Sequence, residues 1–496
     1  MEYTTKAYKQ KEFSTNLNIN IRLFKDIFKN DAILRNRTVE IGKTGFRASV
    51  FYMDGMVNTE ILNESVIKPL ILAKIRPGEI SVENIEAKIL FAGEVSKNTT
   101  LDQAIRGVLY GDTLLMIEGE KTVFTINTKG WRTRGVTEPS DERVLKGPRE
   151  GFDEAALLNV ALIRRKLLTP DLCVELQRVG RRTETLVFIC YLESLADKGI
   201  LKELKKRIAA IDIDGILDSN YIAELIGGKR LPLLKKMGTT ERPDIVAARL
   251  LEGRIAIIVD GTPVVLTIPY LFSENFQSDE DYYVNYLIAS ASRMMRYVCF
   301  FLAVSVPAVF VALLTHHLGL LPTNFMLSVS ALREGVPMSS VTECVLLILI
   351  FEILKETGLR TPQSQGFALS IVGGLVVGQA AVEAKIVSAP MLIAVALSGI
   401  AGLMIPRLRN VVFYLRFILV FLSALLGLYG YIIGFSMFLL LSLSIKSFGV
   451  DTVPSLASPQ FSTFKDTFFR ASWRKMYKRP MFNANKTRLT QSDKND

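Results

Sequence analysis

The sequence predicts an α/β soluble N-terminal domain with two subdomains, followed by a multi-span α-helical membrane domain. Charged residues recur every few positions from Met1 to about Arg296, whereas long uncharged runs dominate from Tyr297 to Ile445. In the first half, short β-like runs alternate with helical patterns, which is typical of an α/β class. A soluble core would not gather its apolar residues into one third of the chain, so we expect the second half to lie in a membrane.

We expect five segments along the 496 residues, with boundaries where the composition of the sequence changes. They are a polar N-terminal tail 1–16, α/β subdomains 17–145 and 146–285, a helical transmembrane domain 286–446 and a basic amphipathic C-terminal tail 447–496. The boundary inside the soluble half rests on a change near Pro139–Pro148, and the transmembrane domain is expected to hold about four to six spans. The chain opens with a polar, basic stretch from Met1 to Asn30, so no signal peptide is expected.

Buried strands are predicted in the soluble half where β-branched and other apolar residues run together. The predicted strands are Ala48–Met53, Leu114–Ile117, Thr185–Leu192, Ala256–Val259 and Val264–Ile268. Three short apolar stretches end in Asp-Gly, at Asp54-Gly55, Asp214-Gly215 and Asp260-Gly261. Carboxylates at strand ends can be catalytic or metal-binding, but Asp-Gly is also a common turn pair, and the turn is the favoured interpretation.

One strong helix is predicted at Gly151–Leu168. It begins with Asp153 and Glu154 and ends with Arg164, Arg165 and Lys166, which matches the helix dipole. We interpret its basic end as a solvated face.

Three uncharged stretches are long enough to cross a hydrocarbon layer of roughly 30 Å. They are Tyr297–Thr315, which follows Arg293 and Arg296 as a cytoplasmic anchor, Thr361–Val382 and Ile386–Pro406. A fourth, Phe417–Ile445, would be about 44 Å long as one helix. It is therefore either a strongly tilted span or a bent pair of helices around Gly427, Gly430 and Gly434.

The apolar stretch Val341–Leu354 carries Glu343 and Glu352, so it is a span that faces protein, a re-entrant piece or an interfacial helix. The loop Thr315–Asn324 has no Lys or Arg and is expected outside. The basic residues Lys355, Arg360, Arg407, Arg409 and Arg416, and the tail from Lys446, are then placed inside. This placement favours Val341–Leu354 as a membrane-crossing helix. It also favours the bent pair of helices for Phe417–Ile445, with both termini cytoplasmic.

No constellation for catalysis, cofactor binding or metal binding is visible, so we do not expect an enzyme. Gly42-Lys43-Thr44 resembles the end of a phosphate-binding loop, but the glycine that this motif needs is replaced by Arg37. His316 and His317 are adjacent and do not share a helix face, and the four Cys have no paired spacing. The net charge of +11 is explained by cytoplasmic Lys and Arg of a membrane protein, so nucleic-acid binding is not expected.

Several motifs occur in an order that is hard to assign to chance. They are Phe51–Gly55, Lys146–Phe152, Gly180–Thr183, Asp214–Ser219, Thr240–Asp244, Val259–Pro263, Arg333–Pro337, Phe351–Leu354, Val377–Ala384 and Ser447–Val450. With these motifs the chain resembles the A subunit of a GerA-type spore germinant receptor over roughly Leu17–Pro454. It departs from the family between Leu225 and Thr240, where a short basic loop replaces a Trp- and Pro-containing stretch, so no ligand contact is assigned to this loop.

The resemblance implies a multi-pass protein in the inner membrane of the dormant bacterial spore, which triggers germination in response to nutrients. It implies that the A subunit acts with a transporter-like B subunit, thought to bind the nutrient, and a lipoprotein C subunit. It further implies a homo-oligomer that forms a nutrient-gated channel for monovalent cations. No cofactor is implied.

The span Thr361–Val382 is the best candidate for a channel-lining helix. One face carries Val372, Val376, Gln379 and Glu383, where valine rings would constrict the path and the polar residues would attract cations. Another face carries Gly374, Gly378 and Ala381, whose small side chains let helix backbones approach closely. The alternative is a packed helix that Glu383 ends, paired with Lys385. Glu343 and Glu352 are rival acidic linings, although they project from opposite sides of a helix.

The basic tail is predicted to form a helix on the membrane surface. Phe469, Trp473 and Tyr477 share one helical face and basic residues surround them, which favours contact with anionic lipids. The candidate surface residues are Arg470, Trp473, Arg474, Lys475, Tyr477 and Lys478.

Two other functions remain open on the sequence. One is a non-conducting membrane scaffold that relays a signal between partners. The other is a stand-alone solute permease, against which the small number of clear spans and the lack of an internal inverted repeat argue.

Overall fold

The fold is taken from a computed structural model that describes residues 11–29, 31–130, 142, 146–228, 234–360, 378–453, 466–476 and 479. The chain divides into two compact units. The soluble unit comprises mainly the chain up to Arg230 and Lys236–Tyr270, and the helical unit comprises mainly Leu271–Tyr477.

The first part of the soluble unit is a five-stranded antiparallel sheet with the order β1-β2-β4-β5-β3. Its strands are β1 (Leu34–Glu40), β2 (Arg47–Met53), β3 (Val95–Asn98), β4 (Thr113–Ile117) and β5 (Val123–Ile126). The helices are α1 (Leu17–Ile27), α2 (Thr59–Leu62) with a π-helical turn Asn63–Ile67, α3 (Lys68–Leu72), α4 (Val82–Lys88) and α5 (Leu101–Leu109).

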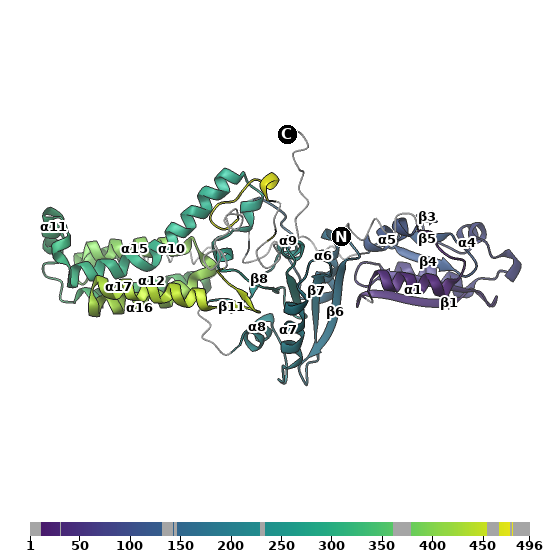
Figure 1. Ribbon diagram of the computed structural model, residues 1–496, viewed down its shortest axis with the longest axis horizontal. Helices are drawn as coiled ribbons and strands as arrows, with labels where there is room; N and C mark the ends of the chain where they lie inside the picture. Colours follow the sequence, from purple (N-terminus) through teal and green to yellow (C-terminus); the bar gives the residue numbers. More distant parts are fainter. Residues whose placement is uncertain are drawn as a thin grey trace. The chain divides into compact units, whose positions relative to one another are not determined.

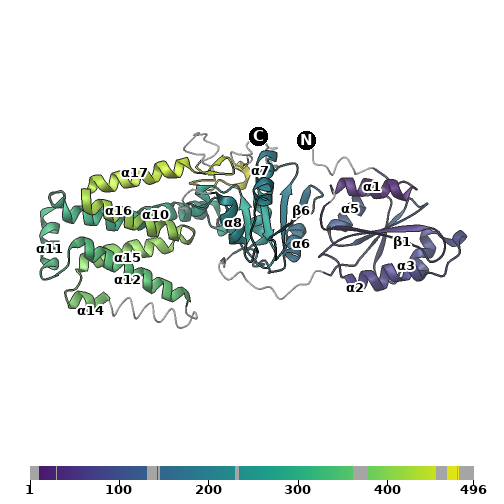
Figure 2. The same ribbon diagram turned by 90° about the horizontal axis from the view of Figure 1, so that it is seen from below.

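Both faces of this sheet are covered, with α1 and α5 on one side and α2 and α3 on the other (Figure 2). Side chains of β4 alternate between the two hydrophobic cores, because successive residues of a strand point to opposite faces. Leu114 and Met116 lie in one core, and Leu115 and Ile117 lie in the other. A strand whose residues are all buried, such as β4, is therefore what a sheet covered on both faces requires.

The second part of the soluble unit is another five-stranded antiparallel sheet, with the order β6-β7-β9-β10-β8 (Figure 1). Its strands are β6 (Leu172–Val179), β7 (Thr185–Leu192), β8 (Gly238–Thr240), β9 (Ile255–Val259) and β10 (Val265–Ile268). The helices are α6 (Ala156–Lys166), α7 (Lys198–Ala209), α8 (Ser219–Gly227) and α9 (Pro243–Leu251). The five strands expected from the sequence are all present, as β2, β4, β7, β9 and β10, which confirms the α/β class.

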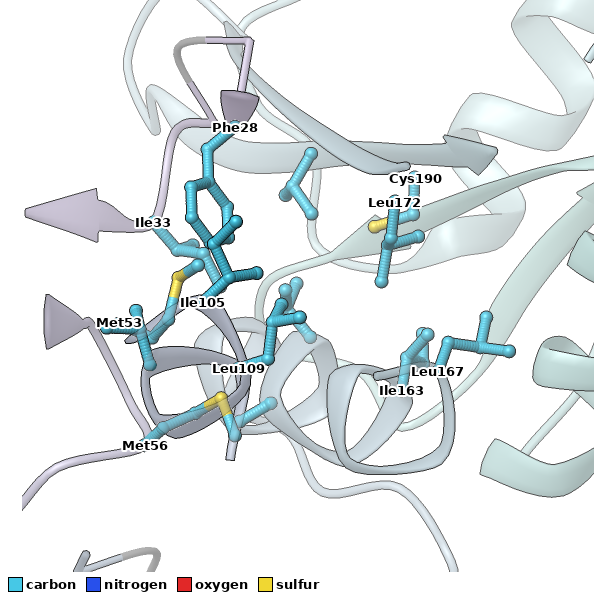
Figure 3. Packing of buried hydrophobic residues seen from close by; sticks show 14 of the residues in the cluster. Phe28, Ile33, Met53, Met56, Ile105, Leu109, Ile163, Leu167, Leu172 and Cys190 are labelled. Carbon is cyan, nitrogen blue, oxygen red and sulfur yellow. The ribbon is translucent and has the colours of Figure 1, made fainter. Parts of the chain in front are cut away.

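The two sheets share one hydrophobic core (Figure 3). Phe28, Ile33, Met53, Met56, Ile105 and Leu109 pack from the first part of the soluble unit. Ile163, Leu167, Leu172 and Cys190 pack from the second part. The expected subdomain boundary near Pro139–Pro148 lies between the two sheets along the sequence and stays a prediction, while the core itself is continuous.

Inside this core, α6 begins later than the sequence predicts, at Ala156 instead of Gly151. Asp260 lies more than a hundred residues away, and its Oδ1 accepts a hydrogen bond of 3.0 Å from the backbone N–H of Ala156. Asp260 therefore satisfies a free donor at the helix start. Gly55 and Gly261 have φ of 79° and 91°, as the turn interpretation expects, whereas the segment at Asp214-Gly215 forms a bend without a positive φ at Gly215.

The interpretation of Arg164 as part of a solvated face is wrong. Its side chain and that of Asp31 are both fully buried and form an ion pair. Arg164 Nη2 also donates 3.1 Å to the backbone oxygen of Leu172. The charge is tolerated in the core because Asp31 supplies its counter-charge.

The cysteines of the soluble unit are buried free thiols, and we expect them to be unreactive. Burial raises the pKa of Cys173 to about 11, and it also raises the pKa of Cys190. At pH 7.4 we expect iodoacetamide to modify Cys173 roughly a hundredfold more slowly than an ordinary exposed thiol, because only the thiolate reacts. Peptide mass spectrometry of the native chain measures this, with the exposed Lys202→Cys variant as a control. Equal rates at Cys173 and at the thiol introduced by Lys202→Cys would contradict the expectation.

The helical unit consists of helices that run side by side, α10 packing against α12, α15, α16 and α17 (Figures 1 and 2). The elements in chain order are 3₁₀ turns Phe272–Phe276 and Asp279–Tyr282, α10 (Tyr286–Thr315), α11 (Thr323–Arg333), α12 (Ser340–Arg360), α14 (Gly378–Glu383), α15 (Ala389–Leu403), α16 (Arg409–Leu426), α17 (Leu428–Ser444), the hairpin β11 (Lys446–Ser447) and β12 (Val450–Asp451), and a 3₁₀ turn Trp473–Lys475. Short 3₁₀ turns at Leu318–Leu320 and Pro406–Leu408 precede α11 and α16.

Two stretches of the described chain, Tyr286–Thr315 and Pro406–Leu426, are long and apolar enough to cross a membrane. The first contains the expected span Tyr297–Thr315 but begins eleven residues earlier. The shorter apolar helices α15 and α17 account for the other uncharged stretches, and α12 contains Val341–Leu354. Of the expected span Thr361–Val382, residues 361–377 lie outside the described part of the chain.

The stretch Phe417–Ile445 is a pair of helices that turns back at Gly427, which settles the choice left open by the sequence. Gly427 has φ 62° and ψ −141° and separates α16 from α17. Gly430 and Gly434 of α17 face Leu422 of α16, where an added Cβ would lie 2.7 Å from the Leu422 side chain at Gly434. Their missing side chains allow the close antiparallel approach.

Candidate functional site

The described part of the candidate pore helix, α14, presents a polar face and a packing face. Gln379 and Glu383 are exposed, and Gln379 Nε2 donates a hydrogen bond of 2.9 Å to Glu383 Oε1. Ala381 packs on the hydrophobic cluster of the helical unit, and a Cβ at Gly378 would touch Leu392 of α15 at 3.6 Å. The division into two faces agrees with the expected helical periodicity.

Three predicted residues of the same helix, Val372, Val376 and Gly374, lie outside the described residues. Their roles as pore lining and helix packing therefore stay predictions. Lys385, the alternative partner of Glu383, has φ 52°, and its side chain lies beside Gly335. In the structure Glu383 Oε1 instead accepts a hydrogen bond from Gln379 Nε2.

Glu343, one of the two alternative acidic pore linings, points into the helical unit. It is completely buried, and its Oε1 accepts hydrogen bonds of 2.5 Å from both the backbone N–H and the hydroxyl of Ser388, just before α15. Arg333 Nη2 lies 3.7 Å from Glu343 Oε2. Glu343 therefore joins α12 to the start of α15.

The second alternative acidic pore lining, Glu352, also has partners inside the helical unit. Its Oε2 lies 2.6 Å from Lys355 Nζ, and its Oε1 lies 3.6 Å from Arg416 Nη1. The side chain of Arg416 is 2% exposed and lies inside the helix bundle, so it is not a solvated charge, while its placement on the cytoplasmic side stays a prediction. Buried charges within a membrane unit are costly and commonly mark functional positions.

A second group of charges lies at the start of α10 and joins it to the tail. We call Asp281, Arg293, Arg296, Asp466 and Arg470 the basal cluster. Asp281 pairs with Arg293 (Oδ2–Nε 3.1 Å) and with Arg296 (Oδ1–Nη2 2.5 Å), and Asp466 pairs with Arg293 at 3.0 Å. Arg293 and Arg296 are thus ion-paired residues within the first part of α10, and their role as a cytoplasmic anchor before the span stays a prediction.

The helix predicted for the basic tail does not form in its described residues, where one 3₁₀ turn spans Trp473–Lys475. Arg470 is buried, and its Nη1 donates hydrogen bonds of 2.6 Å to the carbonyl oxygens of Asp281 and Val284. These bonds hold the tail against the residues just before α10. Trp473, Arg474 and Lys475 are exposed, and Tyr477 and Lys478 lie outside the described residues, so lipid contact stays a prediction.

Sequence reasoning missed the internal partners of these charges. Lys, Arg and Glu beside apolar runs indicate only that a charge is near a membrane. Within the described ranges, no three His, Cys, Asp or Glu side chains come together as a metal site requires.

Comparison with known proteins places the chain in a family. The family model described as "Bacillus/Clostridium GerA spore germination protein" matches residues 22–482. The chain is 39% identical to spore germination protein KA of Bacillus subtilis (strain 168), over 91% of this chain and 83% of that protein. It is 31% identical to spore germination protein GerLA of Bacillus cereus, over 91% of this chain and 92% of that protein.

Two further matches extend this comparison. The chain is 37% identical to the uncharacterized membrane protein YfkQ of B. subtilis, over 91% of this chain and 88% of that protein. The crystallised N-terminal domain of the A subunit of the Bacillus megaterium spore germinant receptor GerK3 is 30% identical, covers 53% of this chain and 98% of its own, and superposes with a TM-score of 0.41. The chain belongs to the GerA family of spore germination proteins, a non-enzymatic family of membrane proteins in which it is an A subunit of a germinant receptor.

Proposed function

We propose that this A subunit assembles with copies of itself into a nutrient-gated channel for monovalent cations in the inner membrane of the spore. The observation that carries the proposal is the exposed pair Gln379 and Glu383 on α14. An exposed carboxylate in an apolar unit is unfavourable beside lipid, and a water-filled path between subunits would accommodate it.

The other acidic residues of the neighbouring helices support this choice. Glu343 and Glu352 of α12 are engaged with Ser388, Arg333, Lys355 and Arg416 inside one subunit. Neither side chain is free to attract a cation, because a basic residue already lies beside each of them. Among the candidates that the structure describes, Glu383 is the carboxylate best suited to line a path.

The proposal extends to the partners and to the orientation. In the receptor, the subunit acts with a transporter-like B subunit, which binds the nutrient, and with a lipoprotein C subunit. The soluble unit and the basic tail lie on the cytoplasmic side. The hairpin of α16 and α17 supports this orientation, because a chain that turns back at Gly427 returns its tail to the side where α16 begins.

The Glu383→Gln variant tests the ion path. In water a unit charge about 4 Å from a cation contributes about 1 kcal/mol, which corresponds to roughly fivefold in local concentration. We therefore expect cation conductance and cation-over-anion selectivity to fall several-fold in planar bilayers that contain the reconstituted three-subunit receptor.

The matched control is Asp451→Asn, which removes an exposed carboxylate of the same unit that pairs with Lys446 at 3.3 Å. Its conductance should equal that of the unsubstituted receptor. Wild-type conductance and selectivity in Glu383→Gln would contradict the proposed path. No current from intact oligomers would favour the non-conducting scaffold, and solute flux through single subunits would favour the permease.

A further inference from the structure

A proline inside α10 leaves a backbone carbonyl oxygen to which side chains of two other helices donate hydrogen bonds. Pro307 has no backbone N–H, so the carbonyl oxygen of Ala303, four residues earlier, loses its normal helical partner. Two side chains from other helices donate to this oxygen. Ser398 Oγ of α15 donates at 2.6 Å, and Arg416 Nε of α16 donates at 3.1 Å.

Arg416 extends this group of contacts to α12. Its Nη2 donates 3.3 Å to the carbonyl oxygen of Ser398, and its Nη1 lies 3.6 Å from Glu352 Oε1 of α12. The Nη1 atom has no hydrogen-bond partner among the described residues. Arg416 is thus hydrogen-bonded to α10 and α15, whereas its link to α12 is a charge attraction alone.

The neighbouring contacts of α12 include a second ion pair to α16, between Glu356 and Arg409, and an aromatic contact with α15. Phe351 lies directly against Gly399 of α15, where an added Cβ would lie 2.6 Å from Cε2 of the Phe351 ring. The salt bridge between Glu352 and Lys355 lies within α12 and would move with that helix. If α12 moved away, Arg416 would keep its bonds to both carbonyl oxygens and would lose only its counter-charge.

We infer that Glu352 and Arg416 form a latch, and that these positioning residues hold α12 against α10, α15 and α16 in the resting receptor. Release of the latch lets α12 move, and we expect this movement to change the position of Gln379 and Glu383 on α14. This inference rests on the proposed function for its link to ion flow. The attraction suits a latch because it is strong in a low-dielectric interior and is lost when the two charges separate.

The test compares three variants in spores and in the purified three-subunit receptor. Glu352→Gln/Arg416→Met removes both charges together, because a neutral pair is tolerated in an interior where a lone charge is not. Arg416→Lys keeps the positive charge. Lys355→Gln is the control, since it removes the other partner of Glu352 and leaves the latch.

For the double variant we expect cation release without nutrient, and backbone hydrogen exchange in α12, to be roughly tenfold faster than in the wild type. This factor corresponds to about 1.4 kcal/mol. Arg416→Lys should lie closer to the wild type than the double variant does, and Lys355→Gln should behave as the wild type. Dormant spores together with wild-type exchange in α12 of a double variant that accumulates normally would overturn the latch.

The two readouts separate the latch from the proposed ion path. Faster exchange in α12 supports the latch even if Glu383→Gln leaves the current unchanged, which would contradict only the path. Altered current in Glu383→Gln with unchanged exchange in the double variant would overturn only the latch. Should the double variant fail to accumulate, Glu352→Gln alone is measured by the same exchange experiment, and wild-type exchange there overturns the latch.

Discussion

Replacing Arg164 by methionine is expected to lower the free energy of unfolding of the soluble unit by about 3–5 kcal/mol, because it leaves a buried carboxylate without its counter-charge. The side chains of Arg164 and Asp31 are both fully buried in the core that the two sheets share. Asp31 would retain its bond from the backbone N–H of Ile33, at 3.0 Å, which cannot neutralise a whole charge. Pulse proteolysis of the purified full-length chain in denaturant measures the change.

The defect of Arg164→Met should depend on pH. Burial raises the pKa of Asp31, and the Arg164 guanidinium opposes this rise. Without the guanidinium the pKa of Asp31 in the folded chain rises further above its unfolded value. A raised folded pKa contributes stability at low pH that is lost as the pH rises through that pKa. The defect should therefore shrink as the pH falls through the raised folded pKa of Asp31, down to about 4, the ordinary pKa of an aspartate in the unfolded chain.

Two controls identify the cause of this defect. Arg164→Met/Asp31→Asn removes both charges and should recover most of the lost stability. Arg47→Met breaks the exposed pair with Glu118, which water screens, and should change the stability little. A loss in Arg164→Met no larger than the loss in Arg47→Met would contradict the importance of the buried pair.

Substituting Gly427 by alanine is expected to disrupt the hairpin of α16 and α17. Its φ of 62° and ψ of −141° lie close to a backbone region that is essentially restricted to glycine, at a cost of about 1–3 kcal/mol for other residues. In addition, the new Cβ would lie 2.7 Å from Nδ1 of His317. We expect most of the purified variant to aggregate in detergent and the remainder to unfold at a lower temperature than the wild type.

Two other glycines separate strain from steric clash. Gly449 has φ 87° with nothing within 4 Å of an added Cβ, so Gly449→Ala tests strain alone. Gly319 has neither a positive φ nor a neighbour within 4 Å, so Gly319→Ala should be neutral. If Gly427→Ala eluted and melted like Gly319→Ala, the turn would not depend on this residue.

Most central strands of the soluble unit could be predicted because burial on both faces demands continuous apolar runs, but β5 was not predicted although all its residues are buried. In β4 and β9 every residue is buried, so their sequences alone identify them as strands. The edge strands β1, β3, β6 and β8 were all missed, and β1 and β6 show the reason. Each has a solvated side, which alternates polar residues such as Arg37 and Glu175 with buried ones and weakens the signal.

In the candidate site, too, some features could be predicted from the sequence and others could not. The helical period by itself placed Gln379 and Glu383 on one face of α14, away from Gly378 and Ala381. It could not show where Arg416 lies, because a charge beside an apolar run has the same appearance whether it faces solvent or a distant partner.

The sequence by itself determined the division into a soluble α/β half and an apolar helical half, the central strands other than β5, and the polar face of α14. Each of these depends on local composition and period, which the chain carries at every position. Only the tertiary structure decided that Arg164 and Arg416 are buried, since their partners Asp31 and Ala303 are 133 and 113 residues away. It also decided that the uncharged stretch after Phe417 forms two helices, because Gly427 takes its conformation where α17 packs back on α16.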